Sequence, residues 1–294
     1  MFRYRSGLPI LIMAALAIPA CQGSREPIRL PSPTTEPIAQ AEPNLTEQEM
    51  MEFLLHAEII GSKTTPKGVT LPLRLTLTDG KISHDAGFQA IDESRTRQTF
   101  PDGHVEINFR DTYKFNIAAY ELAKMVGLGG MMPVTVQRSY LGKPGSLTWW
   151  LPVMMDEVTR NAKKIEPPEV DAWNKQMYKK RVFAELAYDN DPNLTNLLIS
   201  QDWHIWMIDF TRAFRQYKEL RNEKNITGSK CERHLLEKLR TLDREELTRR
   251  TEGFLGKLEI DGIMARRDRI VEIFDDLIAK RGEQAVLYDD PVAK

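Results

Sequence analysis

The residues best suited to chemistry lie in segment 189–196, Asp-Asn-Asp-Pro-Asn-Leu-Thr-Asn, in the middle of the chain. Two apolar, β-rich runs separated by a polar turn follow it over residues 197–208, and Asp209 comes directly after them. Two strands joined by a tight turn form a hairpin, which brings the residue before its first strand beside the residue after its second. The sequence therefore predicts that Asn196 and Asp209 meet at the mouth of a hairpin, with Asp191 close by.

Two carboxylates and a carboxamide at one point form an oxygen-rich pocket, and oxygen donors suit a hard cation such as Mg²⁺. One carboxylate can instead orient a nucleophile, which together with the metal is the minimal chemistry of phosphoryl transfer. An EF-hand is excluded because Leu194 stands at the required glycine and Ser200 at the required bidentate glutamate. A plain turn also accounts for the eight residues alone, since Asn, Asp and Pro favour turns. The predicted link to Asp209 favours the metal site.

Segment 191–196, taken with the run Trp-Met-Ile-Asp-Phe-Thr-Arg-Ala-Phe at 206–214, resembles the catalytic and metal-binding loops of the atypical kinases. These include the phosphatidylinositol 3/4-kinases, the HipA-type toxin kinases and the secretory-pathway Fam20-type kinases. The resemblance implies that Asp191 is the catalytic base and that Asn196 and Asp209 hold Mg²⁺ beside ATP. Asn193 stands where these families often place a histidine.

The same resemblance implies a two-lobed α+β protein-kinase-like fold, with a small β-rich N-lobe (46–150) and a mainly helical C-lobe (151–294). The lobe boundary is expected at Leu151-Pro152, where segments of period 2 give way to long helical segments. The length of 294 residues, with 41% hydrophobic and 28% charged residues, suits one enzyme-sized unit. The net charge of -1 argues against a nucleic-acid partner.

The first 20 residues have the form of a secretory signal peptide. Two arginines precede an apolar run over residues 8–18, which is too short to span a bilayer. The run closes with Ile-Pro-Ala-Cys at 18–21, which resembles a bacterial lipobox and implies a lipid anchor on Cys21. The Pro-rich segment 21–45 is expected to be an extended tether. We therefore expect a protein of the cell envelope, held on the periplasmic or extracellular face of a membrane; an ordinary signal peptide cleaved nearby, or an uncleaved anchor, stays open.

A helix is expected to begin the N-lobe, because Thr46 and Glu49 make a capping box before an apolar stretch. Loop 61–68 follows, with strands predicted at Val69–Leu77 and Ala86–Ile91 and, further along the chain, a hairpin of Val134–Tyr140 and Ser146–Trp150. The loop is a candidate to cover a nucleotide through the backbone at Gly61, with Lys63 and Lys67 adding positive charge. A plain turn explains this loop equally well.

Gln89 occupies the strand position at which kinases of this shape place a lysine on the nucleotide phosphates. A glutamine donates a hydrogen bond to phosphate but brings no charge. Its partner on the helix predicted at Asp111–Val126 is either Glu121 or Asn116, and the sequence leaves both open. Four cations are candidates to replace the missing charge: Lys63, Lys67, Lys114 and Arg138.

Three functions of different classes follow from these observations. The first is an ATP- and Mg²⁺-dependent phosphotransferase that acts on a protein or a small molecule. The second is a catalytically degenerate kinase-like binding module of the envelope, for which Gln89 is the main indication. The third is a structural lipoprotein with a divalent-ion loop. The three intact polar residues Asp191, Asn196 and Asp209 favour the first function over the third.

Overall fold

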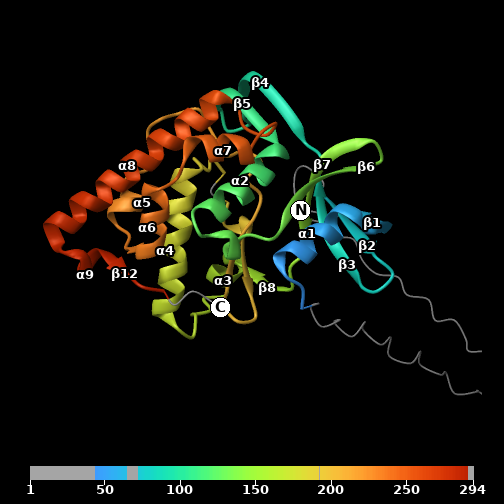
Figure 1. Cartoon of the computed structure of the whole chain (residues 1–294), viewed down its shortest axis with the longest axis horizontal. Helices are drawn as coiled ribbons and strands as arrows, with labels where there is room; N and C mark the ends of the chain where they lie inside the picture. Colours follow the sequence, from blue (N-terminus) through green and yellow to red (C-terminus); the bar gives the residue numbers. More distant parts are fainter. Residues whose placement is uncertain (1–43, 65–71, 192, 291–294) are drawn as a thin grey trace, which may run out of the picture. The chain divides into compact units, whose positions relative to one another are not determined.

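The computed structural model describes residues 44–64, 72–191 and 193–290 (Figure 1). The predicted signal peptide, Cys21, most of the predicted tether and Lys67 lie outside the described residues. Within these ranges, no helix is both long enough and apolar enough to cross a membrane.

The N-terminal lobe is built on a five-stranded antiparallel sheet in the order β1-β2-β3-β7-β6. Its elements are α1 (Glu47–His56), β1 (Glu58–Thr64), β2 (Leu73–Thr78), β3 (Ser83–Gln89), α2 (Lys114–Met125), η1 (Gly129–Met131), β6 (Thr135–Tyr140) and β7 (Lys143–Trp149). The predicted capping box begins α1, where the Glu49 amide donates to Thr46 Oγ1 at 3.3 Å and Glu49 Oε2 accepts the Thr46 amide at 2.7 Å. Helices α1 and α2 both contact β6 and β7.

Period-2 alternation divides the two faces of this sheet. Leu75 and Leu77 of β2, with Ala86 and Phe88 of β3, are buried in the core. The alternate residues of β3, among them Gln89, lie on the opposite face, which we call the inter-lobe face because Gln89 contacts the C-terminal lobe there. The alternation of the sequence thus decides which side chains reach the site.

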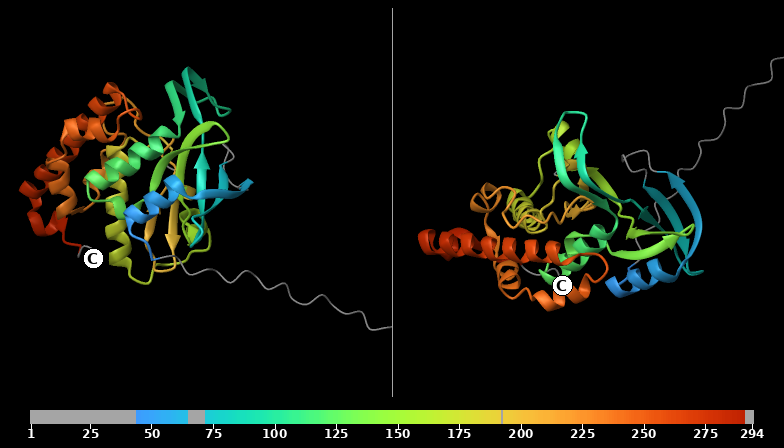
Figure 2. Two further views of the ribbon diagram at one scale, coloured as in Figure 1. Left: turned by 45° about the vertical axis from the view of Figure 1, so that its right-hand side comes forward. Right: turned by 90° about the horizontal axis from the view of Figure 1, so that it is seen from above.

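A long hairpin, β4 (Asp92–Thr99) and β5 (Val105–Thr112), is inserted between β3 and α2 (Figures 1 and 2). The end of β5 is joined to the loop after β10, where the Thr112 amide donates to the carbonyl of Thr211 at 2.9 Å. The same loop is held by the buried Glu106 carboxylate of β5, which pairs with Arg212 and, at 3.2 Å, with Arg215. The hairpin therefore fixes the segment that follows Asp209.

The C-terminal lobe is mainly helical around a three-stranded sheet in the order β10-β9-β8. Its elements are β8 (Val153–Asp156), α3 (Glu157–Ala162), α4 (Val170–Leu186), η2 (Leu194–Asn196), β9 (Leu197–Ser200), β10 (Ile205–Met207), α5 (Lys224–Thr227), β11 (Cys231–Glu232), α6 (Arg233–Arg240), α7 (Arg244–Arg250), α8 (Lys257–Arg281), α9 (Glu283–Val286) and β12 (Leu287–Tyr288). The fully buried Arg266 of α8 donates to the carbonyls of Leu186, at 2.9 Å, and Arg215, at 3.1 Å. It ties the end of α4 to the segment after Asp209.

The predicted two-lobed α+β architecture and the hairpin at 197–208 are confirmed. Three local predictions are wrong. Residues 61–64 belong to strand β1 rather than to a loop, since their backbone pairs with β2. The helix predicted from Asp111 begins at Lys114, because Asp111 and Thr112 still pair with β4. The strand predicted from Ser146 already begins at Lys143, so the turn of that hairpin is shorter than expected.

Candidate active site

The β9–β10 hairpin brings Asn196 and Asp209 to one mouth, as its register requires. Leu197 pairs with Met207, and the Ile208 amide donates to the Asn196 carbonyl at 3.0 Å. Asp209 then adopts a left-handed conformation with φ of 59°, which is uncommon for a residue other than glycine. We call the site around Asn196 and Asp209 the hairpin mouth.

A short helical turn, η2, holds Asn196 in this position. It is capped by Asn193, whose Oδ1 accepts the Thr195 amide at 3.0 Å. An N-cap side chain satisfies an amide that the turn would otherwise leave unpaired. Asn193 therefore has a local structural role at the position where the atypical kinases often have a histidine.

Gln89 joins the two lobes at the hairpin mouth. Its Nε2 donates to Asp209 Oδ1 at 3.3 Å, while its Oε1 accepts from Asn116 Nδ2 at 2.5 Å. Asn116 is buried, and it also donates to Ser146 Oγ at 3.2 Å and accepts the Phe210 amide at 2.7 Å. These bonds form a neutral relay from α2 through β3 to the carboxylate of Asp209.

Of the two helix residues considered as partners of Gln89, the structure selects Asn116. Glu121 instead pairs with Lys124 at 2.8 Å and with Arg250 at 3.5 Å. Five residues correspond to a rotation of about 140° around an α-helix, so the two side chains leave α2 in different directions. The predicted role of Glu121 in cofactor binding is therefore not supported by its position.

The predicted residues of β1 are not brought to the hairpin mouth by any contact among the described residues. Gly61 and Lys63 lie in this edge strand, and Lys63 is exposed. Two other candidate cations are already engaged. Lys114 pairs with Asp92 at 2.9 Å, and Arg138 donates to two backbone carbonyls at the end of α1.

The carboxylate of Asp209 is difficult to ionise without a cation. Burial raises its pKa, and hydrogen bonds from Gln89 and Thr211 act in the opposite direction. The charge of Asp191 raises the pKa further. Because a nearby positive charge favours the ionised form of a carboxyl group, the buried carboxyl group of Asp209 is suited to binding a cation.

Asp111, near the end of β5, is a further carboxylate whose charge interacts with that of Asp209, and sequence reasoning missed it. Burial raises its pKa, as does the charge of Asp209, whereas a hydrogen bond with Thr211 lowers it. One of its carboxylate oxygens, Oδ1, is buried without a hydrogen-bond partner among the described residues. Apolar and polar side chains alternate over residues 105–109, which is the signal of a strand. A helix is instead predicted from Asp111, so this carboxylate is not placed on a strand.

The oxygen donors at the hairpin mouth fit Mg²⁺. Such ions are usually bound by one or two carboxylates together with waters and substrate phosphates, and Asp209 and Asn196 supply a carboxylate and a carboxamide here. Within the described ranges, no three His, Cys, Asp or Glu side chains form a ready-made metal cage. A metal at this site would therefore need further ligands from a bound substrate.

A tryptophan lies on the inter-lobe face beside the hinge between the lobes. A Cβ atom placed on Gly87 would stand 3.9 Å from the ring of Trp150, and the guanidinium of Arg74 lies 4.4 Å from the centre of that ring. Arg74 also pairs with Asp85 at 2.6 Å. Trp150 and Arg74 therefore lie beside Gly87, two residues before Gln89 on the same face of β3.

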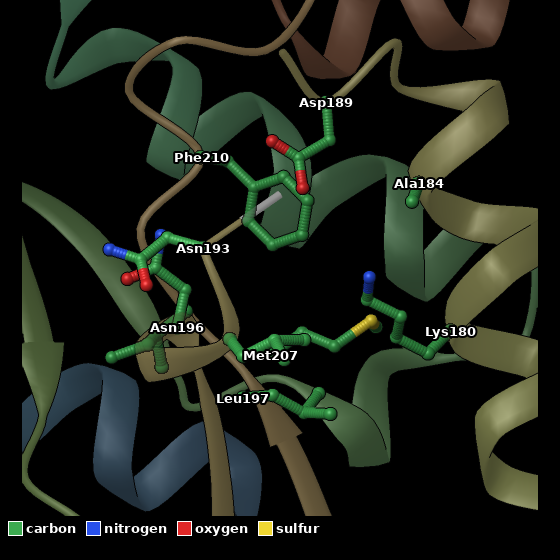
Figure 3. Close-up of a pocket in the computed structure, with 10 residues that line it drawn as sticks. Lys180, Ala184, Asp189, Asn193, Asn196, Leu197, Met207 and Phe210 are labelled. Atoms are coloured by element: carbon green, nitrogen blue, oxygen red, sulfur yellow. The ribbon is translucent and has the colours of Figure 1, made fainter. Parts of the chain in front are cut away.

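A small cavity lies behind the hairpin mouth, between α4 and the β9–β10 hairpin (Figure 3). Lys180 of α4 and Asp189 both line it. Burial raises the pKa of Asp189 to about 6. Asp189 Oδ1 accepts the amide of Asp191 at 3.1 Å, which connects the cavity directly to the predicted base.

Solved kinase structures share this fold. Hydra Fam20, determined with a sugar, aligns with a TM-score of 0.61 at 13% identity, over 83% of this chain and 93% of that chain. The Golgi casein kinase aligns with a TM-score of 0.57 at 13% identity, over 83% of this chain and 78% of that chain. No family model and no curated protein matches the sequence. The similarity establishes the fold, so the chain has a two-lobed kinase-like fold.

Proposed function

We propose that this protein is an atypical kinase that transfers a phosphoryl group from a nucleotide such as ATP, with Mg²⁺, to a protein or a small molecule. The observation that carries the proposal is that Gln89 of the N-terminal lobe meets Asp209 of the C-terminal lobe at the hairpin mouth, where Asn196 also lies. Phosphoryl transfer depends mostly on positioning and charge neutralisation. The site offers the first through its hydrogen bonds and the second through its oxygen donors for a metal.

Each residue has a distinct task in this mechanism. Asp209 and Asn196 would hold Mg²⁺, and the ion would supply positive charge to neutralise the phosphates. Gln89 holds the Asp209 carboxylate in place and leaves the phosphates without a lysine. Asp191 accepts the proton of the attacking hydroxyl group and orients that group.

The neutral relay also supports a second candidate function. In the kinases considered above, a lysine and a glutamate form an ion pair at the positions of Gln89 and Asn116. Here both members are amides, and they satisfy each other. A kinase-like module that binds a nucleotide or another ligand without turnover is consistent with this replacement.

Binding and turnover separate the two candidates. Mg²⁺ plus ATP should raise the melting temperature of the purified protein, since a ligand that binds only the folded state stabilises it. Asp209→Asn should remove that shift, and Asn196→Ala should reduce it. Asp191→Asn should keep the shift and abolish phosphate transfer. Asp276→Asn is the matched control, because this carboxylate is 66% exposed on α8.

Each combination of binding and transfer supports a different function. Binding with transfer supports the kinase, and binding without transfer supports the degenerate module. The absence of any Mg²⁺-dependent shift in the parent protein would refute nucleotide binding at this site. We also propose an envelope location through a lipid on Cys21, which rests on the sequence motif alone.

A further inference from the structure

The cavity behind the hairpin mouth contains two charged groups that the proposed mechanism does not use. Its lining includes Lys180, Asp189, Asn193, Asn196, Met207 and Phe210. In Figure 3 the amine of Lys180 and the carboxylate of Asp189 point toward the same open space, with the two asparagines on its other side. The cavity is therefore polar on several sides, although Met207 and Phe210 line it as well.

The ammonium group of Lys180 is poorly satisfied by the protein. It makes no hydrogen bond and no ion pair within the part of the chain that the structure describes, and burial lowers its pKa. The charge of Asp189 is the strongest influence that favours its protonated form. Lys180 in turn is the strongest influence that favours the ionised form of Asp189, followed by the amide of Asp191. The two charges thus stabilise each other without touching.

The cavity has room for a connecting water molecule. It leaves about 20 Å³ for the centre of a water molecule, and roughly 10–15 Å³ is enough to hold one. A buried water also needs two to four polar partners. The ammonium group of Lys180 is a donor and the carboxylate of Asp189 is an acceptor, and together they supply two such partners.

We propose that Lys180 positions the catalytic loop by acting through Asp189, with one buried water bridging the ammonium and the carboxylate. Asp189 holds the amide of Asp191 at 3.1 Å, so its charge strengthens the bond that orients the base. Lys180 keeps that charge compensated inside the protein. Lys180 and Asp189 are thus positioning residues. The role of Asp191 as base rests on the proposed function, whereas the effect on its amide does not.

Hydrogen exchange at the Asp191 amide, followed by NMR, tests the inference without any need for turnover. Asp189→Asn keeps an acceptor of the same shape and removes the charge. Exchange of this amide should become about tenfold faster, the ratio expected when a charge-assisted hydrogen bond is replaced by a neutral one. Lys180→Met should have the same effect, and Lys180→Gln should match it if charge, rather than hydrogen bonding, is what matters.

The double variant Lys180→Met/Asp189→Asn decides whether Lys180 acts through Asp189. Its exchange should equal that of Asp189→Asn alone, because the target of Lys180 is already lost. Lys175→Met is the matched control: it lies on the same helix, and its partner Asp171 is 83% exposed. Additive effects, or unchanged exchange in Lys180→Met, would overturn the inference.

Kinetics and crystallography supply independent readouts. Lys180→Met should lower kcat about tenfold and leave KM for the nucleotide within about twofold, since the base acts in the chemical step. An equal change in KM would contradict a positioning role. A crystal structure should show a water within hydrogen-bond distance of Lys180 Nζ and Asp189, and an empty cavity would refute the bridge. If the parent protein lacks transfer activity, the proposed kinase function is refuted. The exchange rates of the Asp191 amide still test whether Lys180 and Asp189 position the loop.

Discussion

The neutral relay can be converted to an ion pair by two substitutions, Gln89→Lys and Asn116→Asp, which should each destabilise the protein alone and partly offset each other when combined. Asn116 donates to Gln89 Oε1, and Gln89 Nε2 donates to Asp209. Asn116→Asp alone turns the donor into an acceptor that faces Gln89 Oε1. Rotating the Gln89 amide does not help, since its oxygen would then face the Asp209 carboxylate. In Gln89→Lys alone, the ammonium group of the lysine faces the amide donor of Asn116, so two donors meet and the acceptor is lost.

The expected loss in the free energy of unfolding follows from the polar groups that each single variant leaves unpaired. A buried polar group that loses its partner costs about 1–3 kcal/mol, so each single variant should lose about 2 kcal/mol in the free energy of unfolding. In the double variant the ammonium donates to both carboxylates, and the Phe210 amide keeps an acceptor at position 116. The coupling energy should therefore be favourable by about 2 kcal/mol, within the range of roughly 0.5–3 kcal/mol found for residues in contact.

Urea unfolding of the four proteins measures this cycle with no ligand present. Calorimetric titration with ATP and Mg²⁺ then tests the site. Gln89→Lys should tighten nucleotide binding about tenfold if the phosphates reach this position. The reason is that a hydrogen bond from a charged group is stronger than a neutral one by about 1–1.5 kcal/mol. Gln284→Lys, at an exposed position of α9, controls for added charge. Additive losses, with a coupling energy below about 0.5 kcal/mol, would refute the relay as described.

Three further outcomes are expected. Glu106→Gln should lower the free energy of unfolding by about 3 kcal/mol, measured in urea, because it removes the buried charge shared by Arg212 and Arg215; an unchanged value would contradict the clamp. Burial raises the pKa of Asp209, so its folded form binds the proton more tightly, and stability of the metal-free protein should fall as pH rises through the folded pKa. Asp209→Asn should flatten that dependence. Cys21→Ser should abolish lipid processing and membrane association, as judged by mass spectrometry and fractionation; a processed, membrane-bound variant would exclude the lipid anchor.

The hairpin mouth was predictable because the information is local. Two short apolar runs and a polar turn determine the pairing of β9 with β10, and Asn196 and Asp209 follow from the register alone. The partner of Gln89 was not predictable in this way. Asn116 lies 27 residues away along the chain, and choosing it over Glu121 requires the phase of α2, which depends on where the helix begins.

The β4–β5 hairpin was missed for a different reason. Residues 92–99, Asp-Glu-Ser-Arg-Thr-Arg-Gln-Thr, contain no apolar side chain, and most of them are exposed in the structure. A strand with no buried face has no alternation to detect. Its pairing is instead supported by β5, whose Phe109 and Glu106 are buried. Asp111, at the end of β5, was therefore overlooked together with the hairpin.

The clamp of Glu106 on Arg212 and Arg215 has a consequence for regulation. In many kinases the segment after the metal-binding loop is ordered only when a phosphate is added opposite an arginine cluster. Here a buried carboxylate of β5 faces such a cluster from the moment the chain folds. The charge opposite the arginines is thus a carboxylate of the folded chain rather than an added phosphate. For the kinase proposed above, we expect activity to depend on nucleotide and metal and not on phosphorylation of this segment.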